Sequence, residues 1–388
     1  VDLDGIDLEN VDLTDFGEVN DTIDEPHIKI GSKVFKEFLK VAKRVCATGG
    51  KDIISKATCL CYDKERNKVV GYATDFDVYI EQELENLDTE NILEDPIIVP
   101  TDILIKLSGA VPASTIFYKK DGNIYIRLYG GDLELETHNI TLDKFKFTEE
   151  VSEVSSVDVV NLYSVLKDFA PVVSAAVNPA EKRIVVNEDG SYANYMFAIL
   201  KTDLIKGNYD LKPKDIDVLR GLTLNKKDVE LRVYRTTDAK ATRNVIKGDD
   251  FKYTFLVSEA NISDSLKTNM ATIVDKDGVY IDFIQFYKIV ELAADLPYSV
   301  GKVGLNVSDD GIQINIKTKK GTDNQFNVSG SFDGSPARLS SELIIQAKLL
   351  KVLLRSFAAK QSVKIIVSEL GLGVLTDDYK SVIYTEVK

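Results

Sequence analysis

The feature that most constrains the fold of this chain is an order of helices and strands that recurs along its 388 residues. Amphipathic helices are predicted to start near residues 33, 157 and 282, and shorter helices near 101, 213 and 343. Strands of alternating polarity follow each helix, so each third of the chain reads as a β-α-β-β-β unit written twice. Because this period is too long for a solenoid, we expect an α+β protein of three similar domains.

The expected domains span residues 27–142, 143–270 and 271–388, after an acidic N-terminal extension at 1–26. A chain of this length exceeds what one compact core usually holds, which agrees with several domains. Ser32 is the expected N-cap of the first helix, and the later helices are predicted at residues 101–110, 157–170, 213–222, 282–294 and 342–357. Among the strands, two are expected at 174–177 and 195–201.

Charge is distributed unevenly. The net charge is −14, but residues 1–26 contain ten acidic residues and no Lys or Arg, which leaves −4 for the rest of the chain. A nearly neutral body of this kind can carry a local basic surface. The chain shows no apolar run of the roughly 18 residues that span a bilayer and no signal-peptide pattern, so a cytosolic protein without membrane contact is expected.

The first helix is predicted to have one basic face. Its basic residues lie opposite its apolar stripe: Lys33, Lys36, Lys40, Lys43 and Arg44. The last helix repeats the pattern with Lys348, Lys351 and Arg355, and other predicted helices add Lys106, Lys167 and Lys288. Such faces suit the phosphate backbone of DNA without base reading, although a solvated surface is the ordinary alternative. No aromatic residues interleave, so stacking on single strands is not indicated.

Catalytic and metal-binding motifs are absent. The sequence has no P-loop, no G-x-G-x-x-G turn and no G-x-S-x-G elbow, and it contains only two histidines. Three cysteines, Cys46, Cys59 and Cys61, are too few for a disulfide framework. Cys59 and Cys61 share one face of a predicted strand and are interpreted as buried small side chains. We therefore expect a protein that is not an enzyme and that needs no cofactor or metal.

Local sequence resembles the bacterial three-domain DNA sliding clamp, the beta-subunit family of DNA polymerase III. The resemblance covers residues 27–388 and rests on the ordered set of segments Gly71–Ile80, Ile98–Leu104 and Leu133–Thr137. The family implies a clamp fold in which two chains join head to tail into a ring, with helices lining the hole and sheets outside. It also implies partners: double-stranded DNA held without sequence preference, a DNA polymerase, a clamp loader and a second copy of the chain. The basic helix faces would then line the pore.

The resemblance also implies a pocket for partner peptides. One wall would be the strand containing Tyr195, Met196 and Phe197, and the other the C-terminal strand with Val382, Ile383 and Tyr384. The chain departs from the family here, because it ends Thr385-Glu386-Val387-Lys388 without the usual Met- and Pro-containing tail and lacks the Gly-His-Arg-like stretch. These departures indicate a divergent clamp, such as one encoded by a bacteriophage or a plasmid.

Three further interpretations stay open at this level. A clamp-fold scaffold for transcription or repair proteins would contact DNA weakly, and an enzyme of unrecognised type would need a polar cleft. In the extension, Leu13-Thr14-Asp15-Phe16 loosely resembles the short peptides that clamps bind, so residues 1–26 would either occupy the pocket, shield the basic pore or serve as a solubilising tail.

Overall fold

The computed structural model describes residues 23–46, 52–88, 90–129, 131–138, 140–148, 151–224, 226–227, 229–237, 241–257, 262–357 and 362–384. These residues form two compact units. Unit 1 comprises the described parts of 1–156, 217–225 and 229–257, and unit 2 those of 157–216, 226–228 and 258–388. The extension at 1–22 lies outside the described residues.

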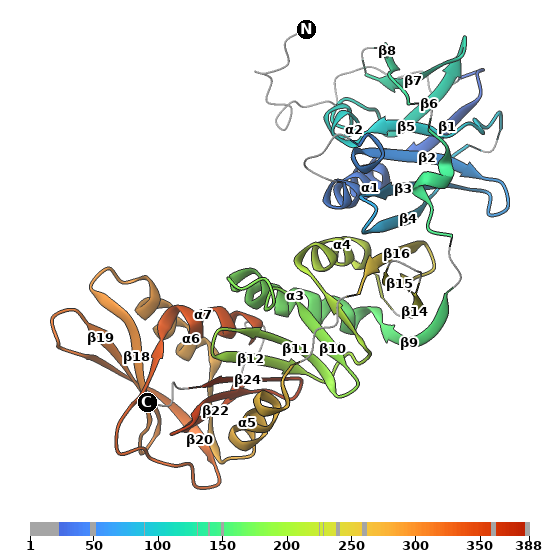
Figure 1. The fold of residues 1–388 in the computed structure, drawn as a ribbon. Helices are drawn as coiled ribbons and strands as arrows, with labels where there is room; N and C mark the ends of the chain where they lie inside the picture. Colours follow the sequence, from blue (N-terminus) through green and yellow to red (C-terminus); the bar gives the residue numbers. More distant parts are fainter. Residues whose placement is uncertain are drawn as a thin grey trace. The chain divides into compact units, whose positions relative to one another are not determined.

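The element order is β-α-β-β-β, repeated six times, with one additional helix before the fifth copy (Figure 1). The first two copies are β1 (His27–Gly31), α1 (Ser32–Val45), β2 (Ala57–Asp63), β3 (Lys68–Thr74), β4 (Tyr79–Leu84), and β5 (Ile97–Pro100), α2 (Thr101–Leu107), β6 (Ser114–Lys120), β7 (Asn123–Leu128), β8 (Gly131–Leu135). The next two are β9 (Ser152–Asp158), α3 (Val159–Ala175), β10 (Ile184–Asn187), β11 (Gly190–Tyr195), β12 (Ala198–Thr202), and β13 (Tyr209–Leu211), α4 (Pro213–Thr223), β14 (Glu230–Thr237), β15 (Thr242–Lys247), β16 (Phe251–Leu256). The additional helix α5 (Asp264–Val274) precedes β17 (Gly278–Asp282), α6 (Phe283–Asp295), β18 (Ser299–Val307), β19 (Gly311–Thr318), β20 (Asn324–Asp333), and β21 (Leu343–Gln346), α7 (Ala347–Leu354), β22 (Ser362–Ser368), β23 (Gly371–Leu375), β24 (Tyr379–Tyr384). The predicted doubled units of an α+β fold are therefore confirmed.

Two successive β-α-β-β-β copies make one repeat, so the chain contains three repeats. The strands form long sheets that continue from one repeat into the next. In unit 1 the order is β5-β2-β3-β4-β16-β15-β14-β9, and a separate sheet runs β1-β6-β7-β8. In unit 2 the order is β13-β10-β11-β12-β24-β23-β22-β17-β20-β19-β18-β21. The two junctions are equivalent: β4 pairs antiparallel with β16, and β12 pairs antiparallel with β24. The last strand of the first half of one repeat thus meets the last strand of the following repeat.

Helix α1 shows why the apolar stripe becomes core. Phe35 and Phe38 are fully buried, and the ring of Phe35 meets that of Phe117 on β6 edge-on at 5.5 Å between centroids. A Cβ added to Gly71 on β3 would lie only 2.4 Å from the Phe38 ring, so the absence of a side chain there lets the helix approach the sheet. The face of α1 opposite these contacts is left to solvent.

Four local predictions were wrong. Ser32 is the first helical residue rather than the N-cap, and its hydroxyl donates to the carbonyl of Pro112. Helix α3 continues through Pro171 to Ala175, so the strand expected at 174–177 is absent. Residues 343–346 form β21 instead of the start of a helix, because Leu343 and Ile345 alternate inward. The strand expected at 195–201 is interrupted after Tyr195, where β11 ends.

Candidate nucleic-acid interface

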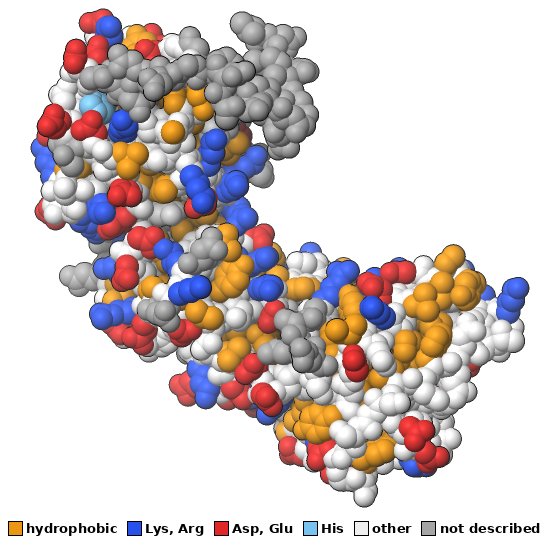
Figure 2. Space-filling model, turned by 180° about the vertical axis from the view of Figure 1, so that it is seen from behind, with side chains coloured by type: hydrophobic (Ala, Val, Ile, Leu, Met, Phe, Trp, Pro, Cys, Tyr) orange, Lys and Arg blue, Asp and Glu red, His pale blue; other side chains and the backbone are white. Residues whose placement is uncertain are grey.

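The basic face of α1 is the strongest candidate site. Lys33, Lys40, Lys43 and Arg44 are exposed and Lys36 is half-buried, while the opposite side of the same helix is core. Figure 2 shows Lys and Arg side chains gathered over α1. Because apolar and basic positions alternate with the helical period, burying one face necessarily presents the other. We refer to these five residues as the basic face of α1.

The charge around the lysines of this face is almost entirely positive within the described part of the chain. Lys33, Lys36, Lys40 and Lys43 have no ion-pair partner among the residues that the structure describes, and Glu37 is the one acidic residue within α1. Unpaired ammonium groups on a fixed helix can attract phosphate without first breaking an internal bond. The face therefore has the electrostatics of a backbone-binding surface.

Arg44 plays a different part from the lysines. Its guanidinium donates to the main-chain carbonyl of Asp217 on α4 at 2.5 Å. A Cβ added to Gly221 of α4 would lie 2.8 Å from Val41 and 2.9 Å from the Arg44 guanidinium. The C-terminal end of α1 is thus held against α4 inside unit 1, and this contact fixes the direction of the basic face.

The predicted basic residues of the third repeat, in unit 2, have a different environment. Lys348 on α7 and Arg355, directly after this helix, are exposed. The ammonium of Lys351 on α7 instead lies 3.2 Å from Glu291 and 2.7 Å from Asp295 of α6. The hydrogen bond to Asp295 raises the pKa of Lys351. Lys288 on α6 is exposed. Sequence reasoning missed the two acids: Glu291 lies within the helix predicted at 282–294, and Asp295 lies one residue beyond its predicted end.

Two remaining predicted basic residues stand on other helices. Lys106 is exposed in the last turn of α2 in unit 1, and Lys167 is exposed on α3 in unit 2. Neither belongs to a cluster as dense as that of α1. The described basic surface is therefore concentrated on the first helix of the first repeat.

The predicted pocket residues meet at one end of the β11–β12 hairpin in unit 2. Met196 and Phe197 form the two-residue tip rather than a strand, and Met196 has φ +54°, which a strand does not allow. Both side chains are about half exposed, at 48% and 45%. Tyr384 on β24 donates its backbone N–H to the carbonyl of Phe197 at 2.8 Å. The two predicted walls are thus neighbours.

Helix α5 covers much of the second wall. Figure 1 shows α5 on the other face of the 12-stranded sheet from α6 and α7. Val382 is fully buried in a cluster with Met270 and Ile273 of α5. Ile383 is also buried, and the hydroxyl of Tyr384 donates to the carbonyl of Leu266 at 2.9 Å. Burial raises the pKa of Tyr384 to about 12. Of the six predicted pocket residues, Met196 and Phe197 are the most exposed.

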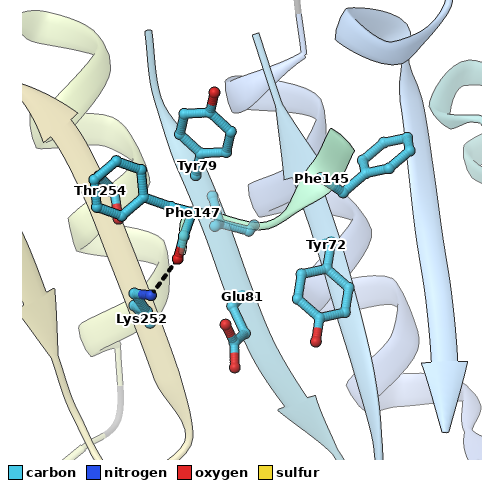
Figure 3. A pocket seen from close by; sticks show the side chains of 8 residues that line it. Tyr72, Tyr79, Glu81, Phe145, Phe147, Lys252 and Thr254 are labelled. Atoms are coloured by element: carbon cyan, nitrogen blue, oxygen red, sulfur yellow. Dashed lines mark hydrogen bonds between the residues drawn. The ribbon is translucent and has the colours of Figure 1, made fainter. Parts of the chain in front are cut away.

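A small pocket in unit 1 lies where a segment after β8 crosses β3, β4 and β16 (Figure 3). Lys252 donates to the carbonyl of Phe147 at 2.8 Å, and burial lowers the pKa of this lysine. Glu81, on the adjacent strand, is held by Arg66 at 2.8 Å. The polar groups of this pocket thus hold the chain's own backbone and side chains, and they form no nucleophile–base pair.

The described residues contain no cluster of three or more His, Cys, Asp or Glu side chains that could hold a metal ion. Within the same part of the chain, no helix is long and apolar enough to cross a membrane. Cys59 and Cys61 are buried and unbridged, and burial raises the pKa of both thiols.

Six β-α-β-β-β units with continuous sheets and a basic helix define an α+β clamp fold. Solved structures with the same fold are sliding clamps of bacterial DNA polymerase III. The beta subunit of Pseudomonas aeruginosa aligns at 16% identity and TM-score 0.69, covering 92% of this chain and 99% of that one. The beta subunit of Thermotoga maritima aligns at 14% identity and TM-score 0.70, covering 92% of this chain and 98% of that one. The DNA polymerase sliding clamp of Bacillus subtilis aligns at 11% identity and TM-score 0.70, covering 93% of this chain and 98% of that one. No protein-family model matches the chain. No curated protein matches it either.

Proposed function

We propose that this protein is a DNA sliding clamp, a processivity factor that encircles duplex DNA and tethers replication proteins to it without catalysing a reaction. The observation that carries the proposal is the basic face of α1 within a clamp fold. Its four lysines have no acidic partner in the described chain, so their charge is available to phosphates. Loose, sequence-independent contact of this kind permits sliding.

A ring requires the chain to join a second copy, and the repeat supports such a joint. The edges of β4 and β12 are each covered by a strand of the following repeat, β16 and β24. In the third repeat the equivalent strand is β20, which pairs with β19 along residues 324–329 and has no second partner there among the described residues. At the start of the chain β8, the counterpart of β16 and β24, lies at the end of its sheet within unit 1.

These two strand edges are complementary by position. Pairing β8 of one copy with β20 of another would repeat the β4–β16 and β12–β24 junctions and would leave neither edge exposed. Three repeats from each of two chains, divided as 27–142, 143–270 and 271–388, would close a head-to-tail ring of six domains. Topological enclosure then retains DNA without high affinity.

The proposed partners follow from this role: double-stranded DNA, a DNA polymerase, a clamp loader and a second copy, in the cytoplasm of a bacterial or phage-infected cell. The half-exposed Met196 and Phe197, beside Tyr195, Val382, Ile383 and Tyr384, would provide the contact for partner peptides. Pore contacts would come chiefly from the basic face of α1, with smaller contributions from Lys106, Lys167, Lys288, Lys348, Lys351 and Arg355.

The test is retention on DNA of different topology. Protein assembled in the presence of a nicked circular plasmid is separated from free protein in high salt, and the circle is then cut once with a restriction enzyme. We expect protein to stay on the intact circle and to leave after cutting, because only linear DNA has ends. Equal retention on circular and linear DNA contradicts the proposal, as does an absence of retention on circles when native mass shows a dimer.

A further inference from the structure

The chain itself contains a polyanionic segment whose charge is opposite to that of the basic face of α1. Residues 1–22 contain eight acidic residues and no Lys, Arg or His. The charge of this segment is opposite to that of the four unpaired lysines. Acidic terminal segments of this density commonly act as interaction tails.

The structure fixes the end of this segment to the same unit as α1. Ile23 is buried against Ile116, Tyr118 and Tyr125. The backbone carbonyl of Pro26 accepts from the N–H of Lys119 at 3.0 Å, and Asn91 donates to the carbonyl of Asp24. The extension is therefore tethered at a defined point on unit 1.

The tether allows the segment to reach α1. Ile116 and Tyr118 flank Phe117, which packs against Phe35 of α1, so Ile23 sits on the opposite face of β6 from the helix. A sheet and one helix together are about 20 Å thick. An extended segment of 22 residues spans up to roughly 70 Å. The distance around the layer is well within that reach.

Three of the eight acids of the segment recur at a regular interval. The tripeptides Val1-Asp2-Leu3, Ile6-Asp7-Leu8 and Val11-Asp12-Leu13 place an aliphatic residue, an aspartate and a leucine every five residues. Three near-equivalent acidic units on one tether can engage the same lysines in turn. Val34, beside Lys33, is 38% exposed and offers an apolar contact for a leucine of such a tripeptide.

We propose that the basic face of α1 binds the acidic segment 1–22 of the same chain, and that this segment competes with DNA for Lys33, Lys36, Lys40 and Lys43. The intramolecular contact stands on charge and tethering alone, whereas the competition rests on the proposed function. Tethering supplies an effective concentration on the order of millimolar, so a weak contact suffices to occupy the face. Duplex DNA has a denser charge and displaces the segment, but this competition lowers the apparent affinity of the protein for DNA.

The first experiment tests the contact without DNA. The full-length protein is compared with a full-length variant in which the eight acids of residues 1–22 become amides (Asp→Asn, Glu→Gln). Acetylation rates of individual lysines are measured by mass spectrometry in low salt and in high salt. The exposed Lys247 of β15, also in unit 1, is the internal control.

We expect the lysines of α1 to react at least about twofold faster in the amide variant or in high salt, with Lys247 unchanged, because tethered acids shield only the face they occupy. Equal rates for the two proteins in low salt overturn the contact. Protection that grows with protein concentration assigns the segment to a second copy and overturns its intramolecular form.

The second experiment tests the competition. We expect the amide variant to bind a short duplex about three- to tenfold more tightly than the natural chain in low salt, with the gain lost in high salt. The gain should also disappear when Lys36→Gln and Lys40→Gln are present in both proteins. If lysine protection is found but neither protein binds DNA, the proposed function fails and the contact stands. If DNA affinity is the same for both, the competition is overturned.

Discussion

Lys351 of α7 donates a hydrogen bond to Asp295 of α6 at 2.7 Å, and Glu291 lies 3.2 Å from the same ammonium group. Two carboxylates thus surround one predicted DNA-binding lysine, whereas the lysines of α1 have none among the described residues. Helices that looked alike in sequence therefore differ in the charge they present.

The first prediction concerns DNA affinity and salt. The double variant Lys36→Gln/Lys40→Gln should reduce the slope of log affinity against log salt by about two, roughly one for each lysine that contacts phosphate. Lys351→Gln should reduce the slope by less than about half of the reduction that each lysine of α1 contributes. The reason is that Glu291 and Asp295 already offset the charge of Lys351. Binding to a duplex is measured by fluorescence anisotropy at several salt concentrations. A larger effect from Lys351 would show that the ion pairs do not persist on DNA.

The second prediction concerns alkaline pH. The hydrogen bond to Asp295 raises the pKa of Lys351 in the folded protein, so its contribution to stability is present below the pKa of an unfolded lysine. It is lost as pH rises through the higher folded value. The difference in unfolding free energy between the natural chain and Asp295→Asn should therefore shrink at strongly alkaline pH. Urea unfolding at neutral and alkaline pH measures it, and a constant difference would contradict the assignment.

The third prediction concerns the approach of α1 to its sheet. Gly71→Ala places a methyl group against the buried ring of Phe38, and we expect a loss of about 1–3 kcal/mol in the free energy of unfolding. Gly109→Ala is the matched control, since its nearest neighbouring atom is 3.9 Å away. Chemical denaturation compares the two. Equal stabilities would mean that Phe38 moves aside without cost.

The fourth prediction concerns the free edge of β20. The N–H of Gly330 donates to Asp310 on the β19 side, so by alternation the N–H of Asn327 points to the unpaired edge. Asn327→Pro removes that donor and should weaken self-association at least about tenfold. Asn327→Ala keeps the N–H and should associate like the natural chain. Sedimentation measures both, with circular dichroism to confirm folding. Unchanged association of the proline variant would remove β20 from the interface.

The fifth prediction concerns the thiols. Burial raises the pKa of Cys59 and Cys61, which keeps them as unreactive thiols, whereas Cys46 is half-buried. A disulfide reagent at neutral pH should modify Cys46 first, and all three cysteines should react after denaturation. Mass spectrometry identifies the modified residue. Early modification of Cys59 would show that the core cluster it forms with Phe145 opens readily.

Much of the fold could be predicted because its signals are local. Alternating strands and the apolar stripe of α1 depend on residues a few positions apart, and they correctly indicated the six units. Helix α5 was missed although Leu266, Met270 and Ile273 follow helical spacing, because this segment was assigned to a domain boundary. The helix predicted at residues 157–170 continues through Pro171 to Ala175.

The candidate site could be predicted only in part. The basic face of α1 follows from one helix, so spacing alone indicated it. The neutralisation of Lys351 depends on packing between α6 and α7, and the covering of Val382 depends on a helix more than a hundred residues earlier in the chain. Such tertiary neighbours leave no local pattern.

The junctions β4–β16 and β12–β24 are ladders of main-chain hydrogen bonds. Main-chain groups are the same in every residue except proline, so these joints place few demands on side-chain identity. Outward-facing positions can then change extensively while successive repeats still meet in the same register. This chain shares only 11% and 16% of its residues with two solved structures that have the same fold. What evolution must preserve at these joints is strand length and the absence of proline.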